Sequence, residues 1–409
     1  MSYKIVKVTN FYPEYLRNYY QRFPGEARKS YDEQFAHLMD DGYSWADFYA
    51  RHLRSLGVDA SEIVYNAAPL QNAWLEEFGG RAGDQDVLLR QLKHLKPDVL
   101  FLQDMHLAIN NQIADIKSLV PSIKLILVYA GVHVSEVLCR QLSHVDVVLT
   151  CNPGFIDFYN SRGMTSYVLN HAFEPELLSR LDSCNEYMDT DVVFTGSLIL
   201  GSGFHEKRIF FLEKLIEHNI DVKIYGHIST SNMLKLRAKQ VAYLLAKSMR
   251  SCGLGGVASY TPVIRKAAAW TAYPKSNGYS QNLVKSVSPP VYGIEMFKVL
   301  RKSKIVLNSH IDVAGQYAGN SRLYEATGVG SCLLTDWKKN LQELFTPDTE
   351  TMTYKNIDQC LEVLHMLLSD SEKRKRISVQ GQKKTLSSHT FFHRAQQLDE
   401  IVRSHLAHN

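Results

Sequence analysis

A cation and a carboxylate stand one helical turn apart in the segment YAGNSRLYEATGVG, residues 317–330. Asn320 and Ser321 are residue types that favour the start of a helix, so Arg322 falls in the first turn and Glu325 lies on the same face. The start of a helix offers unpaired backbone N–H groups and a positive dipole end, which suit phosphate. A carboxylate there can accept hydrogen bonds from a sugar diol. The residues therefore predict that Arg322 and backbone amides hold a diphosphate and that Glu325 holds a ribose.

The same spacing has a second interpretation. Arg–Glu pairs three residues apart are common on ordinary helices, so the spacing alone does not separate a ligand site from a surface ion pair. Gly319 permits a close approach of the backbone, and Gly328 and Gly330 favour the end of the helix after about two turns. A short helix between two strands places the pair near the carboxyl ends of the strands, where open α/β sheets bind ligands.

Five further residues are candidates for the same donor site. Gly196 ends a predicted strand and begins a loop beside the diphosphate, and Arg208 can reach phosphate from the next helix. Tyr292 and Gly293 open a predicted helix and can frame a nucleobase, whereas His310 follows the carboxyl end of a predicted strand. The alternatives are a plain surface loop, an exposed helix charge and a simple helix start.

Candidates for a catalytic base follow two strands in the first half of the chain. Asp104 and His106 come after VLFLQ, and His133 comes after LILVYAG. Each of these side chains can take a proton from an acceptor hydroxyl, which is required only if the reaction inverts the anomeric centre. The alternative for Asp104 is a helix cap. His171 falls at the predicted domain junction.

Metal and cofactor motifs were searched for and rejected. His389 and His393 have the i,i+4 spacing that can suit zinc, but no HExxH glutamate and no third ligand accompany them, and they read as a helix start. Gly201 and Gly203 do not form the dinucleotide fingerprint, so NAD is rejected there. The six cysteines include no CxxC pair, which favours reduced thiols in a cytoplasmic protein. We expect neither a metal nor a cofactor.

Apolar strand-like runs alternate with helical patterns along the whole chain, which predicts an α/β fold. Three of the runs are apolar throughout, as in parallel strands that are covered on both faces. A long amphipathic stretch at residues 31–57 has apolar residues near helical spacing and ends at a glycine. The predicted strands are Lys4–Phe11, Ser61–Ala67, Asp98–Asp104, Lys124–Gly131, Val145–Asn152, Asp191–Leu198, Asp221–His227, Lys304–His310 and Ser331–Asp336.

Two doubly wound halves follow from this pattern. A polar, acidic stretch separates them, and a long irregular insert that opens with a helix at Asn232–Arg250 interrupts the second half. Its aromatic residues offer a partner surface, although the oligomeric state is not indicated. The expected division is residues 1–170 for an acceptor-side domain, 171–190 for a linker, 191–388 for a donor domain with insert 229–290, and 389–409 for a terminal helix that packs back on the first domain.

Composition excludes several classes of protein. The formal charge of +4 over 409 residues is too mild and too evenly spread to indicate nucleic-acid binding. The N-terminus does not read as a signal peptide, and no run approaches the length of a membrane span. The basic run EKRKRISVQGQKK at residues 372–384 reads as a solvated face, with contact to an anionic membrane as the alternative. We expect a cytoplasmic protein, with the inner face of the membrane as an alternative location.

Several segments resemble the blocks of CgeB-type glycosyltransferases, the spore maturation protein CgeB group. They are FTGSL, DVKIYG, GIEMFKVLRKSKIVLNSHID, AGNSRLYEATGVGSCLLTDWKKNLQELF and HTFFHR, in order from Asp191 to Arg394, with the insert unmatched. GYSWADFYARHLRSLG and KPDVLFLQD resemble the same group less specifically. The resemblance implies the GT-B fold, with two Rossmann-like domains facing a central cleft.

The resemblance also implies a function. A GT-B glycosyltransferase of bacterial glycoconjugates moves a sugar from a nucleotide-sugar donor to a glycan, lipid-linked or small-molecule hydroxyl acceptor, without a metal. Arg322 and Glu325 match the group's Arg-x-x-Glu, but Tyr317 stands where many GT-B enzymes have a second glutamate, which leaves the donor sugar contact unassigned. The alternatives are a nucleotide-sugar epimerase on the same scaffold and a non-catalytic sugar- or nucleotide-binding protein.

Overall fold

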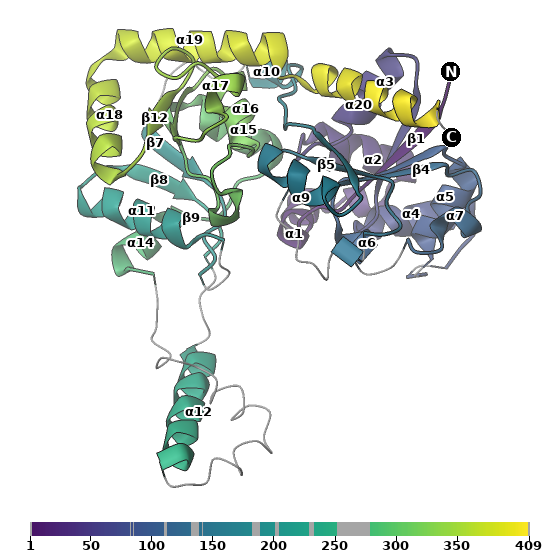
Figure 1. Ribbon diagram of the computed structural model, residues 1–409, viewed down its shortest axis with the longest axis horizontal. Helices are drawn as coiled ribbons and strands as arrows, with labels where there is room; N and C mark the ends of the chain where they lie inside the picture. The colour runs from purple at the N-terminus through teal and green to yellow at the C-terminus, as the bar shows by residue number, and fades with distance from the viewer. Residues whose placement is uncertain are drawn as a thin grey trace.

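Two parallel sheets of six strands form the framework of the protein, which is described here as a computed structural model (Figure 1). Each sheet with its helices is an α/β domain, called the N-terminal lobe and the C-terminal lobe below. The structure describes residues 2–81, 83–84, 86–109, 113–131, 139–140, 142–181, 189–200, 204–228, 233–251 and 279–407.

The N-terminal sheet has the strand order β2-β1-β3-β4-β5-β6, and neighbouring strands are parallel. Its strands are β1 (Lys4–Thr9), β2 (Asp59–Val64), β3 (Val99–Leu102), β4 (Leu125–Tyr129), β5 (Val147–Thr150) and β6 (Thr165–Val168). Its helices are α1 (Pro13–Arg22), α2 (Tyr31–Asp40), α3 (Phe48–Ser55), α4 (Ala68–Phe78), α5 (Val87–Leu95), α6 (His106–Ile109), α7 (Ile116–Leu119) and α9 (Ile156–Asn160).

The C-terminal sheet has the order β12-β11-β10-β7-β8-β9, again with parallel neighbours. Its strands are β7 (Thr190–Thr195), β8 (Val222–Tyr225), β9 (Val287–Ser288), β10 (Ser303–Asn308), β11 (Cys332–Asp336) and β12 (Met352–Tyr354). Its helices are α11 (Glu206–Glu217), α14 (Gln281–Ser286), α15 (Gly293–Arg301), α16 (Arg322–Gly328), α17 (Leu341–Leu344), α18 (Ile357–Ser369) and α19 (Ser371–Ser388).

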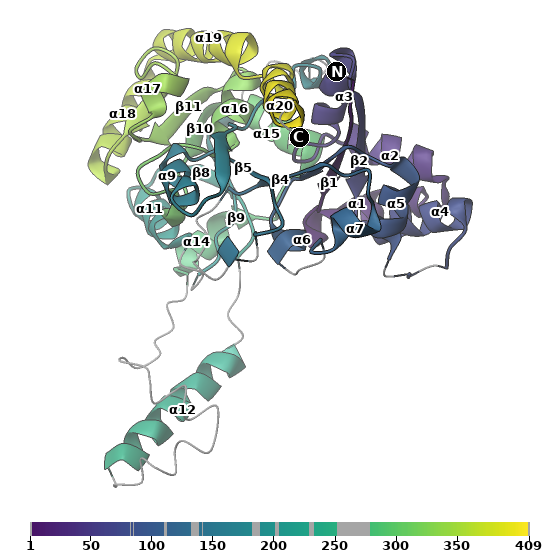
Figure 2. The same ribbon diagram turned by 45° about the vertical axis from the view of Figure 1, so that its right-hand side comes forward.

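Three helices lie outside these two layers. Helix α10 (Leu177–Leu181) lies in the connection between the sheets, and α20 (Phe391–Leu406) follows α19 and packs on α3 of the N-terminal lobe (Figure 1). Helix α12 (Met233–Ser251) projects away from both sheets in the two views (Figures 1 and 2). Among the described helices, none is both long enough and apolar enough to cross a bilayer.

The nine strands predicted from the sequence are all present, and the helix at the start of the insert is confirmed as α12. The additional strands β6, β9 and β12 lie at sheet edges or are only two to four residues long. The prediction of one helical stretch over residues 31–57 was wrong, because the chain breaks between α2 and α3. Gly42, Ser44 and Ala46 have positive φ angles there, which an α-helix does not allow.

One hydrophobic core is shared between the lobes. Phe391 of α20 lies against Phe48 and Tyr49 of α3, with ring centroids 4.9 and 5.4 Å away. Tyr324 of α16 and Phe173 of the connection belong to the same cluster of buried residues as these rings. The interface between the lobes is therefore built like a domain interior, and it fixes where the carboxyl ends of the two sheets face each other.

Candidate functional site

Arg322 and Glu325 form an ion pair within helix α16. The distance from NH1 of Arg322 to Oε2 of Glu325 is 2.7 Å, and the two side chains are 13% and 12% exposed. The same NH1 donates to the sulfur of Met296 at 3.2 Å. The Nε of Arg322 is buried and has no hydrogen-bond partner among the residues that the structure describes. The pair is thus intrahelical and mostly shielded from solvent, and the guanidinium keeps an unused donor.

The start of α16 is tied to the strand beside it. Ser321 occupies the position before the helix, but its side chain makes no capping hydrogen bond. Asn320 instead donates from Nδ2 to Oδ1 of Asn308, at 2.6 Å, and Asn308 donates to Thr335 at 2.9 Å. These amide contacts anchor the loop before α16 to the carboxyl ends of β10 and β11. Helix α16 ends at Gly328, as predicted.

His310 lies at the carboxyl end of β10 and is held by Asp336 at the end of β11. Nδ1 of His310 lies 2.6 Å from Oδ1 of Asp336, and the backbone N–H of His310 donates to the same oxygen at 3.0 Å. Burial would raise the pKa of Asp336, but His310 and Lys338 hold it well below its usual range. Because Nδ1–H points at a carboxylate, Nε2 is the remaining ring nitrogen of His310. It is buried, and no described residue forms a hydrogen bond with it.

Asp336 and Lys338 were not among the residues predicted for the site. Lys338 lies 3.3 Å from Asp336 and donates to the carbonyl of Gly315 at 2.7 Å. The sequence could have indicated that Asp336 lies near His310, because the predicted strand that ends at Asp336 neighbours the strand that leads to His310. Parallel neighbours end at the same edge of a sheet.

Arg208 and Gly196 lie beneath this edge. Nε of Arg208 donates to the carbonyl of Ser309 at 3.0 Å, and NH1 donates to the carbonyl of Ser197 at 3.2 Å. Burial lowers the pKa of Arg208 to about 10. A Cβ added to Gly196 would come within 3.3 Å of NH1 of Arg208 and of the ring of Phe194. Arg208 therefore connects the loop after β7 to the loop after β10 through hydrogen bonds.

Tyr292 and Gly293 begin α15 and lie against the N-terminal lobe. The ring of Tyr292 lies edge-on to Tyr15, with the centroids 5.7 Å apart. Gly293 has a φ of +53°, and an added Cβ would meet Asp41 at 2.3 Å. The N–H of Ile294 donates to the carbonyl of Asp41 at 2.7 Å. The first turn of α15 therefore contacts the other lobe through Tyr292 to Ile294, and through Met296 it also contacts Arg322.

The candidates for a base lie at the carboxyl end of β3. Oδ1 of Asp104 accepts a hydrogen bond from the backbone N–H of His106 at 2.7 Å, so Asp104 caps α6. Burial raises the pKa of Asp104, which favours a proton carrier closer to neutral pH than an exposed aspartate. His106 is exposed at the start of α6, and His133 lies outside the described residues.

His171 lies in the connection between the lobes. Trp45 donates from its indole N–H to Nδ1 of His171 at 3.2 Å, and the hydroxyl of Tyr129 lies 3.4 Å from Nε2. Burial lowers the pKa of His171 to about 4, so the ring is neutral at pH 7. The structure gives it packing and hydrogen-bond partners rather than an open ring nitrogen.

The loop before α16 fits closely against the end of β5. Nδ2 of Asn152 donates to the carbonyl of Ala314 at 3.2 Å. A Cβ on Gly319 would meet the carbonyl oxygen of Cys151 at 2.6 Å, and a Cβ on Gly154 would meet the ring of Tyr317 at 2.5 Å. The two lobes therefore meet at the loop that leads into Arg322.

His389 and His393 both have hydrogen-bond partners within the protein. Nε2 of His389 donates to the carbonyl of Leu344 at 2.9 Å, and His393 closes a capping box with Thr390 at the start of α20. Within the described part of the chain, no three metal-ligand side chains come together.

Comparisons with known proteins bear on both lobes. Residues 207–400 match the model of a family described as glycosyl transferase-like, and this segment contains Arg208, His310, Arg322 and Glu325. No curated protein matches the chain.

The chain is similar over its full length to several solved structures. Sucrose-phosphate synthase from Thermosynechococcus elongatus has 10% identity, a TM-score of 0.53 and coverage of 100% of both chains. HepE from Anabaena in complex with UDP-glucose has 12% identity, a TM-score of 0.55 and coverage of 98% of this chain and 100% of HepE. A glycosyltransferase from Rickettsia africae has 11% identity, a TM-score of 0.53 and coverage of 99% of both chains. The chain thus has the GT-B fold that the sequence predicted.

Proposed function

We propose that this chain is a glycosyltransferase that moves a sugar from a nucleoside diphosphate donor to a hydroxyl acceptor. The observation that carries the proposal is the position of Arg322, Glu325 and His310. His310 lies at the carboxyl end of β10, and Arg322 and Glu325 lie on α16, whose preceding loop is anchored to Asn308 of the same strand. All three residues fall inside the segment that matches the glycosyl transferase-like family.

The Arg322–Glu325 pair is suited to exchange partners when a donor arrives. The Nε of Arg322 is an unused, buried donor, and a guanidinium can bind phosphate oxygens with two parallel N–H groups. Once Arg322 turns to the diphosphate, Glu325 is released to accept hydrogen bonds from the ribose hydroxyls. Arg322 then keeps an anionic partner and Glu325 keeps hydrogen-bond donors, which matters because a buried charge without partners is costly.

Charge stabilisation is the chemical step that these residues support. Negative charge builds up on the diphosphate as the glycosidic bond breaks, and a fixed cation nearby stabilises that charge most in the transition state. Nε2 of His310, oriented by Asp336, offers one more polar contact at the same edge. We propose that these groups do the work for which other transferases use a divalent metal. Chelation with EDTA should therefore leave transfer unchanged.

The acceptor is proposed to lie against the N-terminal lobe. Asp104 and His106 stand at the carboxyl end of β3, and together with His133 they remain the candidates for a base if the reaction inverts the anomeric centre. The donor class is a nucleotide sugar. UDP-sugars are the first to test, because HepE was solved with UDP-glucose.

The decisive experiment compares two i,i+3 ion pairs on adjacent helices. We expect Arg322→Ala to lower kcat/KM for transfer by the equivalent of roughly 2–4 kcal/mol, as for the removal of a charge-stabilising donor. Lys298→Ala is the matched control, because Lys298 pairs with Glu295 on α15 at 2.8 Å but both side chains are well exposed. We expect that variant to stay within about twofold of the parent protein.

Binding of the donor is measured in parallel by calorimetry with UDP, GDP and dTDP and their sugars. Glu325→Gln should weaken the binding of whichever nucleotide the parent protein takes. Turnover of Arg322→Ala near that of the parent protein would refute the assignment, and failure of the parent protein to bind any of the nucleotides would refute the function.

A further inference from the structure

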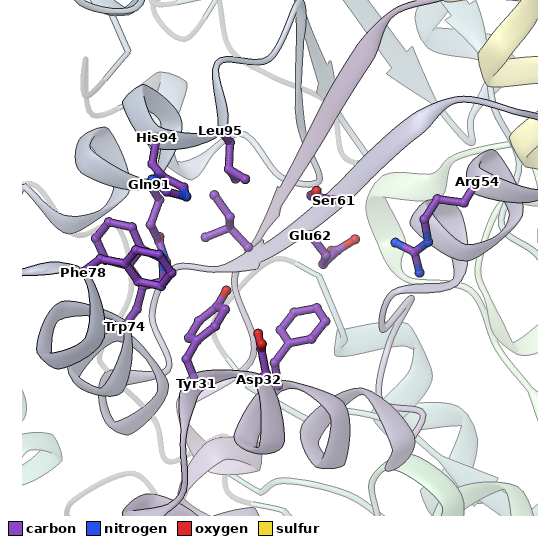
Figure 3. A pocket seen from close by; sticks show the side chains of 12 residues that line it. Tyr31, Asp32, Arg54, Ser61, Glu62, Trp74, Phe78, Gln91, His94 and Leu95 are labelled. Carbon is purple, nitrogen blue, oxygen red and sulfur yellow. The ribbon is translucent and has the colours of Figure 1, made fainter.

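A cavity lies on the outer flank of the N-terminal lobe, far along the sheet from the Arg322–Glu325 pair. It has a volume of about 280 Å³ and is bounded by α2, β2, α4 and α5 (Figure 3). Strand β2 is the edge strand of the sheet, whereas β5, which meets the loop before α16, lies three strands beyond β1. The volume is near the lower limit for small-molecule sites, roughly 300 Å³, which suits a single small ring.

One wall of the cavity is aromatic. Trp74 and Phe78 of α4 are stacked, with ring centroids 4.9 Å apart and an interplanar angle of 17°. His94 of α5 lies edge-on to Phe78 at 4.9 Å. Aromatic faces carry a negative quadrupole, so they attract rings whose faces present C–H groups. This wall therefore suits the apolar face of a saturated ring.

A buried amide without a partner reaches the cavity from the facing helix. Gln91 is only 2% exposed, and both its amide nitrogen and its amide oxygen lack a hydrogen-bond partner within the described chain. Leaving a buried amide unsatisfied costs on the order of 1–3 kcal/mol, so such groups call for an explanation. A carboxamide offers two donors and an acceptor side by side, which matches a pair of adjacent hydroxyls, each of which both donates and accepts.

The remaining polar groups indicate a neutral ligand. Glu62 of β2 is buried at the inner end of the cavity, and its charge is already matched by Lys7, which contacts it on the neighbouring strand. Arg54 at the rim donates to the carbonyl of Ala60 at 2.9 Å and lies 3.8 Å from Asp47, so its charge is already paired within the protein. Tyr31 directs its hydroxyl into the cavity (Figure 3). An anionic ligand would meet Glu62 without a free cation, and a hydroxyl-bearing ring would meet hydrogen-bonding groups.

We propose that this cavity binds one neutral sugar residue, packed on Trp74 and Phe78 and hydrogen-bonded by Gln91, as a second carbohydrate site remote from the donor edge. The site can take a free monosaccharide or one residue of a longer glycan, because the ring chemistry is the same. The inference does not depend on the catalytic activity proposed above.

Saturation-transfer NMR on the full chain tests the proposal. The probes are the methyl glycosides of glucose, galactose and N-acetylglucosamine, each at about 10 mM, since a ligand of this size is expected to bind with a dissociation constant on the order of 1 mM. We expect transfer to the ring protons of at least one glycoside. A second experiment uses tetra- and pentasaccharides of the sugar that binds. Tighter binding than that of the methyl glycoside would identify a glycan as the ligand, and equal binding would identify a free sugar.

Two variants locate the site. Gln91→Leu should weaken sugar binding by about tenfold or more, through the loss of two hydrogen bonds, and should leave the melting temperature equal or higher because it removes an unsatisfied amide. Phe78→Ala should weaken binding less, because Trp74 remains. Binding of UDP or another nucleotide should be unchanged in both variants, which separates this site from the donor site.

Four results would overturn the proposal, and three of them concern the glycosides and the Gln91→Leu variant. They are no transfer to any glycoside in the parent protein, unchanged sugar binding in Gln91→Leu, and a lower melting temperature of Gln91→Leu with sugar binding retained, which would make the amide structural. Stronger transfer to adenine or to choline than to every glycoside would also reject a sugar as the ligand.

Discussion

Charged side chains at the carboxyl edge of the C-terminal sheet are already paired with one another. Arg322 contacts Glu325, and His310 contacts Asp336. A donor must therefore exchange these partners rather than enter an empty set of charges. Exchange leaves Arg322 with an anionic partner and Glu325 with hydrogen-bond donors after binding. Selection of the donor then depends on how well a diphosphate and a diol replace the internal contacts.

For individual residues, the sequence indicated which side chains lie at the carboxyl edge of the C-terminal sheet. It did not indicate which contacts these side chains make. The spacing of Arg322 and Glu325 is the same for an internal pair and for a ligand site, so spacing could not separate the two. The sequence was compatible with an exposed Arg208 that could reach phosphate. In the structure its guanidinium is buried and donates three hydrogen bonds to two protein carbonyls. Those carbonyls come from loops that only the folded sheet brings together, and no local pattern encodes them.

Close approach at Gly319 gives a prediction for a single residue. We expect Gly319→Ala to destabilise the protein by about 1–3 kcal/mol, because the new methyl group would meet the carbonyl oxygen of Cys151 at 2.6 Å and backbone atoms move only with strain. Urea unfolding measures the change. Gly25→Ala is the control, because a Cβ there meets nothing within 4 Å. Equal midpoints for the two variants would contradict the interpretation of the contact.

Secondary structure was predictable where one periodicity ran through a whole element. The fully buried strands β3, β4 and β5 read as uninterrupted apolar runs, because parallel strands are covered on both faces. Strand β9 has only two residues and no such run. The break between α2 and α3 escaped prediction because apolar residues continue at near-helical spacing through it. Ser44 and Ala46, which have positive φ angles there, are not residue types that mark such a conformation in a sequence.

Helix α20 gives a prediction with a control one residue away. Phe391 is 3% exposed and lies under α3, whereas its neighbour Phe392 is 38% exposed. We expect Phe391→Ala to lower the free energy of unfolding by roughly 3–5 kcal/mol and Phe392→Ala to change it by less than about 1 kcal/mol. Thermal or urea unfolding monitored by circular dichroism measures both. Similar losses in the two variants would mean that α20 does not pack on the N-terminal lobe in solution.

Over the whole molecule, the sequence predicted two lobes but not the core that they share. Tyr324, Phe345 and Phe391 come from three separate helices or loops of the second half of the chain, yet they belong to one cluster with Trp45 and Tyr49 of the first half. Contacts at such long sequence separation leave no periodic signal. The shared core indicates that the two lobes unfold together rather than one by one.

Two buried histidines at the junction predict sensitivity to acid. Burial lowers the pKa of His171 and of His389 to about 4 each, whereas an unfolded histidine titrates near 6.5. The unfolded chain therefore binds more protons between these values, and stability falls as the pH falls from about 7 toward 4. We expect each histidine to cost on the order of 2 kcal/mol at about pH 5.

The variant His389→Gln separates the destabilisation caused by protonation of His389 from acid unfolding that has other causes. Nδ1 of His389 accepts from Arg394 at 2.8 Å and Nε2 contacts the carbonyl of Leu344, and a glutamine amide can make one contact of each kind without titrating. Melting temperatures at pH 7.5 and 5 should differ less in the variant than in the parent protein. The same difference in both proteins would show that His389 is not a source of the acid sensitivity.

The chain crosses between the lobes twice, once between β6 and β7 and again between α19 and α20. The two crossings lie side by side, because Phe173 donates to the carbonyl of His389 and Phe391 donates to the carbonyl of Phe173, at 3.0 and 3.1 Å. Two parallel crossing segments that are hydrogen-bonded to each other restrain the orientation of one lobe relative to the other. Together with the shared core they oppose twisting and sliding of one lobe against the other, so we expect Arg322 to keep a fixed position relative to the N-terminal lobe.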